Sequence, residues 1–426
     1  MLDLLIVGAG LTGLIAANTA AQAGLKVKII GKGLGAAHWS AGTIDVLGYA
    51  PFLKQEYVVE PLDGVVQLTR HNEAHPYALL DEGELASALD SFRLLMNDAG
   101  LPYGQANKHE NLLLPSPVGA ARPTYLAPQA QIGGDLKKNE PMLIAGFEGM
   151  RDFYPLLIAE NLAKMGLQTR GAIMPMDLIT DRRDANTVQL AQGLDKETQR
   201  ERLGQHLKGL VHPGERIGLP AILGLHKHAE VVAELERISG AAVFEIPTLP
   251  PSVPGIRLLA ALQNHLRHLG VRIEPAMEVI SAKVRAAENG TAGRVEWLES
   301  KTTARPMQHR AAKFLVATGG LLGGGFNSDH NGRVWETIFD LPLTIPQDRS
   351  EWFDRKFLSA DGHPVFTGGV AVNRRFQPVT ADRRVCYENL WAAGHMLAGA
   401  DPIVERSTEG IAVATGAAAG KAIVAM

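Results

Sequence analysis

A glycine-rich turn near the start of the chain has the spacing of a nucleotide-binding loop. Gly8, Gly10 and Gly13 follow an apolar run, Leu2–Val7, and precede a run of small residues that predicts a helix, Leu14–Ala23. Gly8 would permit a tight turn, Gly10 would let a phosphate approach the backbone, and Gly13 would let the helix pack close to the strand. The helix would direct its free N–H groups and its positive end at the phosphate. Glycines also make ordinary turns, but the strand before and the helix after favour nucleotide binding.

The second predicted strand, Val27–Ile30, ends without the acidic residue typical of such a unit. An Asp or Glu at this point usually hydrogen-bonds the adenosine ribose of NAD or FAD, and Gly31 stands there instead, followed by Lys32. Two interpretations stay open: the ribose is held by backbone or water, or the ligand is a mononucleotide such as FMN. Farther along, Ser40 and Gly42 lie in a small-residue loop that suits close passage along a flat ring system. We predict that Lys32, Ser40 and Gly42 contact the cofactor.

Two later segments repeat the pattern of a buried strand that runs into glycine. Thr318 and Gly319 end the first of these segments, and Gly394 ends the second. A helix of small residues that begins near Gly410 and runs to about Val424 would direct its first N–H groups at an electron-rich group, such as a flavin carbonyl. We therefore predict an α/β protein with a Rossmann-like FAD/NAD(P)-binding fold built from both chain ends.

The looser pattern in the middle of the chain predicts an inserted α+β domain for substrate or partner interaction. We expect residues 1–50 and 256–426 to form the nucleotide-binding domain and residues 51–255 to form the insertion. Asn111–Asp135 is rich in proline, glycine and β-forming residues, which indicates short strands. A hairpin is expected around Asn289–Gly290 in the C-terminal part.

Composition excludes several classes of function. The 426 residues are 46% hydrophobic, which is enough for a substantial core, and a net charge of −3 argues against nucleic-acid binding. The single cysteine, Cys386, allows no disulfide within the chain and no iron–sulfur cluster, so any cluster would sit in a partner. His226 and His228 would lie on different faces of a helix, so no metal site is predicted. Without a signal peptide or a long apolar run, the protein is expected to be soluble and cytoplasmic.

The order and spacing of Gly8–Gly13, Ala317–Gly320 and Ala392–His395 resemble the two-dinucleotide-binding flavoprotein superfamily. Within it, the chain is similar to the family of B subunits of anaerobic glycerol-3-phosphate dehydrogenases. This similarity is carried by the chain length, by His38–Asp45 after a strand that lacks its acid, and by Gly399–Ile403 near the C-terminal end.

The resemblance implies a flavoprotein subunit that oxidises sn-glycerol 3-phosphate to dihydroxyacetone phosphate. Its cofactor would be FMN, with FAD as the alternative. It would pair with an FAD-bearing A subunit and with an iron–sulfur, membrane-associated C subunit, which would place it at the inner membrane as a peripheral subunit. Electrons would pass to a quinone and on to fumarate or nitrate. Two alternatives remain: a stand-alone FAD-dependent oxidoreductase with another substrate, or a non-catalytic electron-relay or assembly subunit.

We predict His395 and Arg406 as the catalytic residues. Oxidation of a secondary alcohol by a flavin needs a base for the hydroxyl proton, and histidine is the usual base near neutral pH. Most members of the superfamily carry Asp where this chain has His395, so His395 would replace a carboxylate there. Arg406 lies just before the helix that should face the flavin, and arginine suits phosphate recognition. Further candidates, each of which could equally be a surface residue, are His38, His363, Arg257, Arg374 and Arg375.

Overall fold

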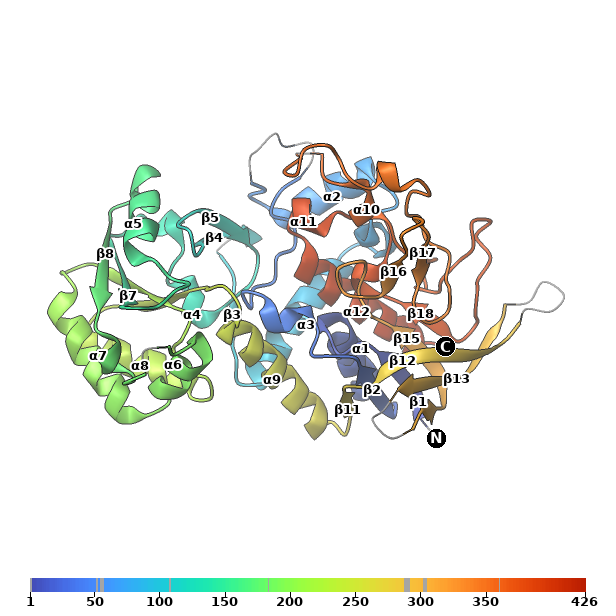
Figure 1. Ribbon diagram of the computed structural model, residues 1–426, viewed down its shortest axis with the longest axis horizontal. Coiled ribbons are helices and arrows are strands. Elements are labelled where there is room, and N and C mark those ends of the chain that lie inside the picture. Colours follow the sequence, from blue (N-terminus) through green and yellow to red (C-terminus); the bar gives the residue numbers. More distant parts are fainter. Residues whose placement is uncertain are drawn as a thin grey trace. The chain divides into compact units, whose positions relative to one another are not determined.

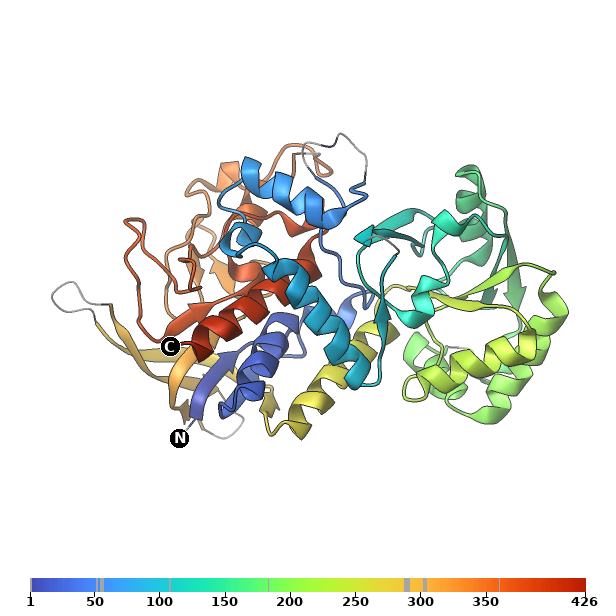
Figure 2. The ribbon, with the colours of Figure 1, turned by 180° about the vertical axis from the view of Figure 1, so that it is seen from behind.

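The computed structural model describes residues 2–50, 53, 57–106, 109–182, 184–286, 292–301, 305–359 and 361–426, and the chain divides into two compact units (Figures 1 and 2). The first unit comprises Met1–Ala37, Asp45–Ala99 and Ala261–Met426, and the second comprises His38–Ile44 and Gly100–Ala260. The predicted insertion began at residue 51, whereas the structure assigns most of the first hundred residues to the first unit. Helix α9 (Val253–His268) crosses the division between the units.

The first unit contains a five-stranded parallel sheet with the order β11-β2-β1-β15-β18. Its strands are β1 (Leu2–Val7), β2 (Val27–Gly31), β11 (Arg272–Pro275), β15 (Ala311–Val316) and β18 (Leu390–Ala392). In the register, Val7 lies opposite Ile30 on one side and Val316 on the other. The central strands are nearly continuous apolar runs because helices cover both faces of such a sheet. The α/β class and the contribution of both chain ends to one sheet are confirmed.

Small residues let two helices of the first unit approach closely. Helix α1 (Leu11–Gln22) packs against α12 (Thr408–Val424), as both views show (Figures 1 and 2). A Cβ added to Gly416 would lie 2.7 Å from the Thr12 carbonyl oxygen, so no larger residue fits there without movement. Helix α3 (Glu84–Asp98) also packs against α12, which explains why this segment belongs to the first unit and not to the insertion.

Peripheral strands and short helices complete the first unit. A three-stranded antiparallel sheet contains β12 (Glu278–Arg285), β13 (Arg294–Lys301) and β14 (Met307–His309), and a separate antiparallel pair contains β16 (Phe326–Ser328) and β17 (Val334–Glu336). The hairpin of β12 and β13 was expected from the sequence, although its predicted turn at Asn289–Gly290 lies outside the described residues. The remaining helices are α2 (Pro61–His71), α10 (Pro364–Thr367) and α11 (Pro402–Glu405).

The second unit has a parallel sheet of its own, with the order β10-β9-β7-β8. Its strands are β7 (Met142–Phe147), β8 (Thr169–Met174), β9 (Arg216–Pro220) and β10 (Val243–Ile246), and its helices are α4 (Gln129–Ile132), α5 (Pro155–Lys164), α6 (Thr187–Leu194), α7 (Glu197–Leu210) and α8 (His228–Ser239). Its antiparallel strand pairs are β3 (Tyr103–Gly104) with β6 (Ala127–Pro128) and β4 (Leu112–Pro115) with β5 (Ala121–Thr124), and an isolated antiparallel bridge joins Ile44 and Leu126. The α+β expectation is therefore wrong for the main sheet, because helices connect its successive strands and such crossovers make them parallel.

Within the described part of the chain, every helix is too short or too polar to cross a membrane.

Candidate functional site

The glycine-rich turn after β1 has the geometry that its spacing predicts. Gly8 has a φ of 122°, and a Cβ there would overlap the carbonyl oxygen of Ala317 at the end of β15. A Cβ at Gly13 would overlap the Gly8 carbonyl oxygen, whereas a Cβ at Gly10 would meet no atom within 4 Å. Gly10 is also the N-cap of α1 and supplies no side-chain cap. The start of α1 therefore offers backbone N–H groups beside open space, which suits a phosphate.

The turns after β15 and β18 meet this first turn. Gly319 and Gly394 both have positive φ, of 79° and 80°. A Cβ at Gly320 would lie 2.6 Å from the His395 carbonyl oxygen, and one at Gly394 would overlap the Thr12 hydroxyl. The Gly394 N–H donates to Thr415 Oγ1 of α12 at 2.9 Å. The three predicted segments thus converge at the carboxyl ends of adjacent parallel strands, which is where ligands bind in such sheets.

Thr318 also lies at this convergence, and Gly410 does not serve as predicted. Thr318 Oγ1 is 4.0 Å from Met396 Sδ, so the turn after β15 touches the turn after β18. The Gly410 N–H, by contrast, donates to the Asp45 carbonyl oxygen at 3.0 Å, and a Cβ at Gly410 would overlap the Tyr77 hydroxyl. The backbone donor that the sequence assigned to a flavin carbonyl is therefore engaged within the protein.

His395 lies in the turn after β18 and is held by the first turn of α12. Its Nε2 is 2.8 Å from the Thr408 carbonyl oxygen, and because a carbonyl only accepts, Nε2 carries the proton. Burial lowers the pKa of His395, and the hydrogen bond to Thr408 opposes that shift. A neutral ring with Nδ1 as its acceptor is the form suited to a general base.

Arg406 precedes α12 in a left-handed backbone conformation, with a φ of 50°. Its Nη2 is 3.3 Å from Asp45 Oδ2, and its Nε is buried with no hydrogen-bond partner among the described residues. A buried guanidinium nitrogen without a partner is costly, so this side chain has capacity for a further acceptor. The arrangement is compatible with binding an anionic group beside α12.

The remaining predicted cofactor contacts have other environments. Lys32 is 79% exposed, and its Nζ forms an ion pair with Glu278 at 2.7 Å. A Cβ at Gly31 would lie 3.1 Å from the Ala9 backbone nitrogen, so the strand end packs tightly on the glycine-rich turn. Ser40 and Gly42 belong to the second unit, where the Gly42 N–H donates to Ser40 Oγ at 3.2 Å. Their cofactor contacts stay predictions.

The other candidate bases and cations have structural roles. Arg257 is buried in the second unit in a bidentate ion pair with Glu245, at 2.8 and 2.9 Å. Arg374 is exposed and pairs with Asp81, and Arg375 is also exposed. His363 accepts from the Asp354 N–H and donates to the Phe357 carbonyl, and His38 packs edge-on against Trp39. His226 and His228 belong to no cluster able to hold a metal ion among the described residues.

A buried polar pair beside Arg406 was not expected from the sequence. His75 Nε2 lies 3.1 Å from Glu405 Oε2, and their side chains are 0% and 5% exposed. These residues are separated by 330 positions, and neither belongs to a recognisable spacing pattern. The one signal that could have pointed to this region is the polar character of Asp45 and Asp401 within otherwise small or apolar segments.

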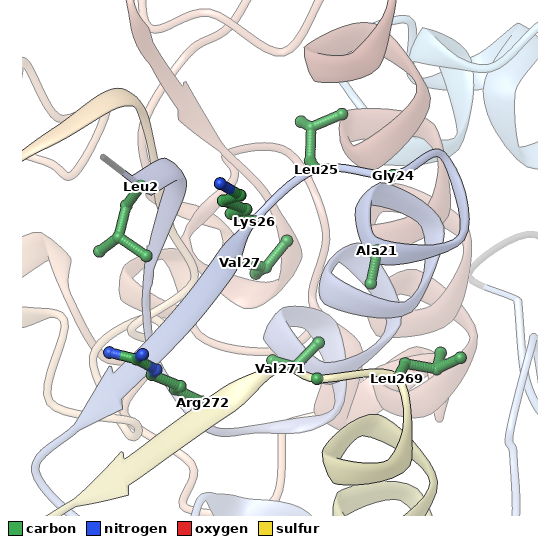
Figure 3. A pocket seen from close by; sticks show the side chains of 10 residues that line it. Leu2, Ala21, Gly24, Leu25, Lys26, Val27, Leu269, Val271 and Arg272 are labelled. Atoms are coloured by element: carbon green, nitrogen blue, oxygen red, sulfur yellow. The ribbon is translucent and has the colours of Figure 1, made fainter.

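A hollow of about 680 Å³ lies at the opposite end of the first unit's sheet (Figure 3). It is bordered by Leu2, Val27 and Arg272 at the amino ends of three strands and by Gly24 and Leu269 after two helices (Figure 3). Nucleotides bind at the carboxyl ends of parallel strands. This hollow is therefore no candidate for the nucleotide site.

The chain is similar to known proteins over most of its length. A family model described as an FAD binding domain matches residues 3–411. A probable B subunit of anaerobic glycerol-3-phosphate dehydrogenase from Halobacterium salinarum is 32% identical, over 99% of this chain and 97% of that protein. The B subunit of the same enzyme from Aliivibrio fischeri is 27% identical, over 99% and 95%. The crystal structure of a 3-ketosteroid delta1-dehydrogenase from Sterolibacterium denitrificans matches with a TM-score of 0.47 and 13% identity, over 100% of this chain and 99% of that chain.

Proposed function

Because the chain belongs to the family of anaerobic glycerol-3-phosphate dehydrogenase B subunits, with an FAD binding domain over most of its length, we propose that it oxidises sn-glycerol 3-phosphate to dihydroxyacetone phosphate as a flavoprotein subunit. The observation that carries the proposal is the convergence of the turns at Gly8–Gly13, Gly319 and Gly394. These turns leave open backbone at the start of α1, and their residues fit a flavin phosphate held by main-chain N–H groups.

We propose FMN as the cofactor, with FAD as the alternative. The position of the ribose-binding acid holds Gly31, whose tight packing on Ala9 leaves little room for a side chain. Lys32, the next residue, has Glu278 as its partner. An adenosine half would therefore find fewer side-chain contacts than in a typical dinucleotide site. FAD remains the alternative because the matching family model describes an FAD binding domain.

His395 and Arg406 are the residues that we propose act on the substrate. A bound flavin would supply the hydride acceptor for the carbon that bears the secondary hydroxyl. His395 would accept the hydroxyl proton at Nδ1, because Nε2 already donates to Thr408. Arg406 would bind the phosphate through its guanidinium, whose Nε has no partner among the described residues.

The proposal includes partner subunits. We propose an FAD-bearing A subunit and an iron–sulfur, membrane-associated C subunit, through which this chain would reside at the inner membrane. The single Cys386 supports this division, because a cluster normally takes four thiolates, and burial raises the pKa of this thiol and so disfavours the thiolate. Electrons would leave through the partner toward a quinone, and on to fumarate or nitrate.

The test is to identify the acid-released flavin of the purified chain and to follow flavin reduction by glycerol 3-phosphate with and without the FAD-bearing A subunit. We expect FMN, and bleaching of its absorbance by the substrate. FAD with full activity in the chain alone would favour a stand-alone enzyme. Flavin that is reduced only when the A subunit is present would instead favour an electron-relay subunit. A chain that takes up neither flavin would contradict the proposal.

A further inference from the structure

A buried polar cluster lies next to the turn that leads into α12. It consists of His75, Glu405 and Ser407, all within the first unit. Glu405 Oε2 accepts from His75 Nε2 at 3.1 Å and from Ser407 Oγ at 2.8 Å, and Glu405 Oε1 accepts from the Asp401 N–H at 3.3 Å. We call these three residues the Glu405 cluster. A buried network in which each group has a partner fixes its surroundings more strongly than a partly satisfied one.

The chemistry of each group in the Glu405 cluster is specified by its partners. The Tyr77 N–H donates to His75 Nδ1 at 3.1 Å, so the His75 proton resides on Nε2 and points at Glu405. Glu405 therefore receives three donors and gives none. Only a carboxylate accepts from all three, because the NH₂ group of glutamine would face a donor in either orientation.

The Glu405 cluster holds a turn that is unfavourable by itself. Arg406 has a left-handed backbone, which is uncommon for a residue other than glycine. The Glu405 carbonyl accepts from the Gly48 and Tyr49 N–H groups at 2.9 and 3.0 Å, and Asp45 pairs with the Arg406 side chain. Such a conformation persists where its surroundings over-determine it, and this is frequently the case at active sites.

The turn leads directly to the group that holds His395. Ser407 is followed by Thr408, whose carbonyl accepts from His395 Nε2. We infer that His75, Glu405 and Ser407 are positioning residues that fix the Thr408 carbonyl and thereby hold the His395 ring with Nδ1 as its acceptor. This inference rests on the proposed function for the catalytic role of His395, but the ring's placement is testable without turnover.

The test is an NMR titration of ¹³C-labelled histidine in the full-length chain with its flavin, with the His395 signal assigned by the variant His395→Gln. The turn that carries His395 contacts the first turn of α12, the start of α1, the glycine-rich turn after β15, and the segment at Gly369 and Val370, whose Val370 N–H donates to the Met396 carbonyl at 2.7 Å. The first turn of α12 carries Glu409, whereas the other three segments carry no titratable residue. Glu409→Gln is therefore the control for charge, and we expect it to leave the pKa of His395 unchanged.

Two matched pairs of variants separate the cluster's hydrogen bonds from general packing. Glutamine retains the His75 Nε2 donor and asparagine retains only the Nδ1 acceptor, so His75→Gln should preserve the pKa of His395. His75→Asn should lower this pKa further, because it weakens the Thr408 hydrogen bond that opposes the effect of burial. Likewise Ser407→Ala should lower the pKa of His395 further, and Ser407→Thr, which keeps the hydroxyl, should not. In flavin reduction, His75→Asn and Ser407→Ala should lower kcat about tenfold with KM changed less than about twofold.

The pKa of His395 decides the inference. An unchanged value in His75→Asn and Ser407→Ala, with an intact fold by circular dichroism, would overturn it, as would equal shifts in both members of each pair. If Ser407→Ala does not fold, the two His75 variants decide. Failure of glycerol 3-phosphate to reduce the wild-type flavin would count against the proposed function alone, because the titration needs no substrate.

Discussion

The two parallel sheets of this chain differ in the residues that lie at the carboxyl ends of their strands. In the first unit, glycines bring backbone against backbone, as at Gly8 and Gly320, and leave open space beside Gly10. In the second unit, the Arg257–Glu245 ion pair lies near the ends of β9 and β10 and contacts Leu223 and Gly224 in the loop after β9. We call the carboxyl end of the first unit's sheet, with its open space beside Gly10, the open end. We call the carboxyl end of the second unit's sheet, with its internal ion pair, the closed end. The architecture alone does not make a ligand site, because the residues after the strands decide it.

In the second unit, both members of the Arg257–Glu245 pair form further hydrogen bonds within the protein. Glu245 accepts from both terminal nitrogens of Arg257 and from the Leu223 N–H, and Arg257 Nε donates to the Gly224 carbonyl. Burial by itself would raise the pKa of Glu245, but the charges of Arg257 and His228 and the hydrogen bonds from Arg257 and Leu223 together outweigh it, so the pKa is lowered and the carboxylate stays ionised. Both Glu245 oxygens and all three Arg257 side-chain nitrogens are thus engaged within the protein.

The largest effect is expected from breaking this closed end. Arg257→Leu would leave the Glu245 carboxylate buried without its counter-ion, and we expect a loss of about 3–5 kcal/mol in the free energy of unfolding. Chemical denaturation measures the loss. The double variant Arg257→Leu/Glu245→Leu should recover much of it, since no unpaired charge remains. Flavin content per folded molecule should not change, and a loss of flavin in the folded fraction would show that Arg257 has a binding role after all.

The next largest effects are expected from substitutions of glycines at the open end. Gly8→Ala would place a Cβ on the Ala317 carbonyl in a backbone conformation that L side chains rarely adopt, so we expect roughly 2–4 kcal/mol of destabilisation. Gly10→Ala would meet no atom within 4 Å and should change stability by less than about 0.5 kcal/mol. Its Cβ would instead occupy the open space, and flavin affinity should fall at least about tenfold, as measured by fluorescence titration. Equal flavin affinity in Gly10→Ala and wild type would place the phosphate elsewhere.

Acid pH should destabilise both units, in part through His395 in the first unit and His228 in the second. Burial lowers the pKa of His395 in the first unit and of His228 in the second. The unfolded chain therefore binds more protons than the folded chain below about pH 6.5, so stability is lost as the pH falls through 6.5 toward the lowered folded-state values. The midpoint temperature of thermal unfolding should decrease as the pH is lowered from about 7 to about 5.5. The decrease should be smaller in His395→Gln and in His228→Gln than in the wild type. Parallel pH profiles for wild type and both variants would contradict the assignment.

The smallest effect concerns the edge of the open end. The Lys32–Glu278 pair is exposed, so Lys32→Ala should cost at most about 0.5 kcal/mol. If Lys32 stays paired with Glu278 as in the structure, flavin affinity in Lys32→Ala should differ from that of the wild type by less than about twofold. A drop of about tenfold in Lys32→Ala, with no such drop in Glu278→Ala, would support the cofactor contact that the sequence predicted.

The parts of the fold with strong local patterns could be predicted from the sequence. Spacing located the β-α-β unit and the glycine turns at Gly8, Gly319 and Gly394, because each depends on a few adjacent residues. The predicted start of the insertion was wrong because the amphipathic pattern of α3 does not show which domain the helix packs against. Only its contact with α12 assigns it to the first unit. The parallel sheet of the second unit was missed because it pairs strands that long helical segments separate in the sequence.

The candidate site was predicted less completely than the fold. His395 and Arg406 do lie beside the start of α12, as expected from their position in the sequence. Their partners could not be predicted, because Asp45 is 361 positions from Arg406 and His75 is 330 positions from Glu405. Gly410 was assigned an open backbone donor, whereas a distant carbonyl occupies it. Long-range hydrogen bonds leave no periodic signal in a sequence.

The pairing of β1 with β15 has a consequence for biosynthesis. Leu2 is aligned with Ala311, so the first strand leaves the ribosome well before its neighbour is made. For a separation of roughly 300 residues, synthesis at about 5–20 residues per second makes this delay roughly 15–60 seconds. During that time the strands of the second unit, between Met142 and Ile246, are already complete and can assemble. The apolar first strand therefore lacks its β15 neighbour during that time, and cofactor loading can only follow synthesis of the turns at Gly319 and Gly394.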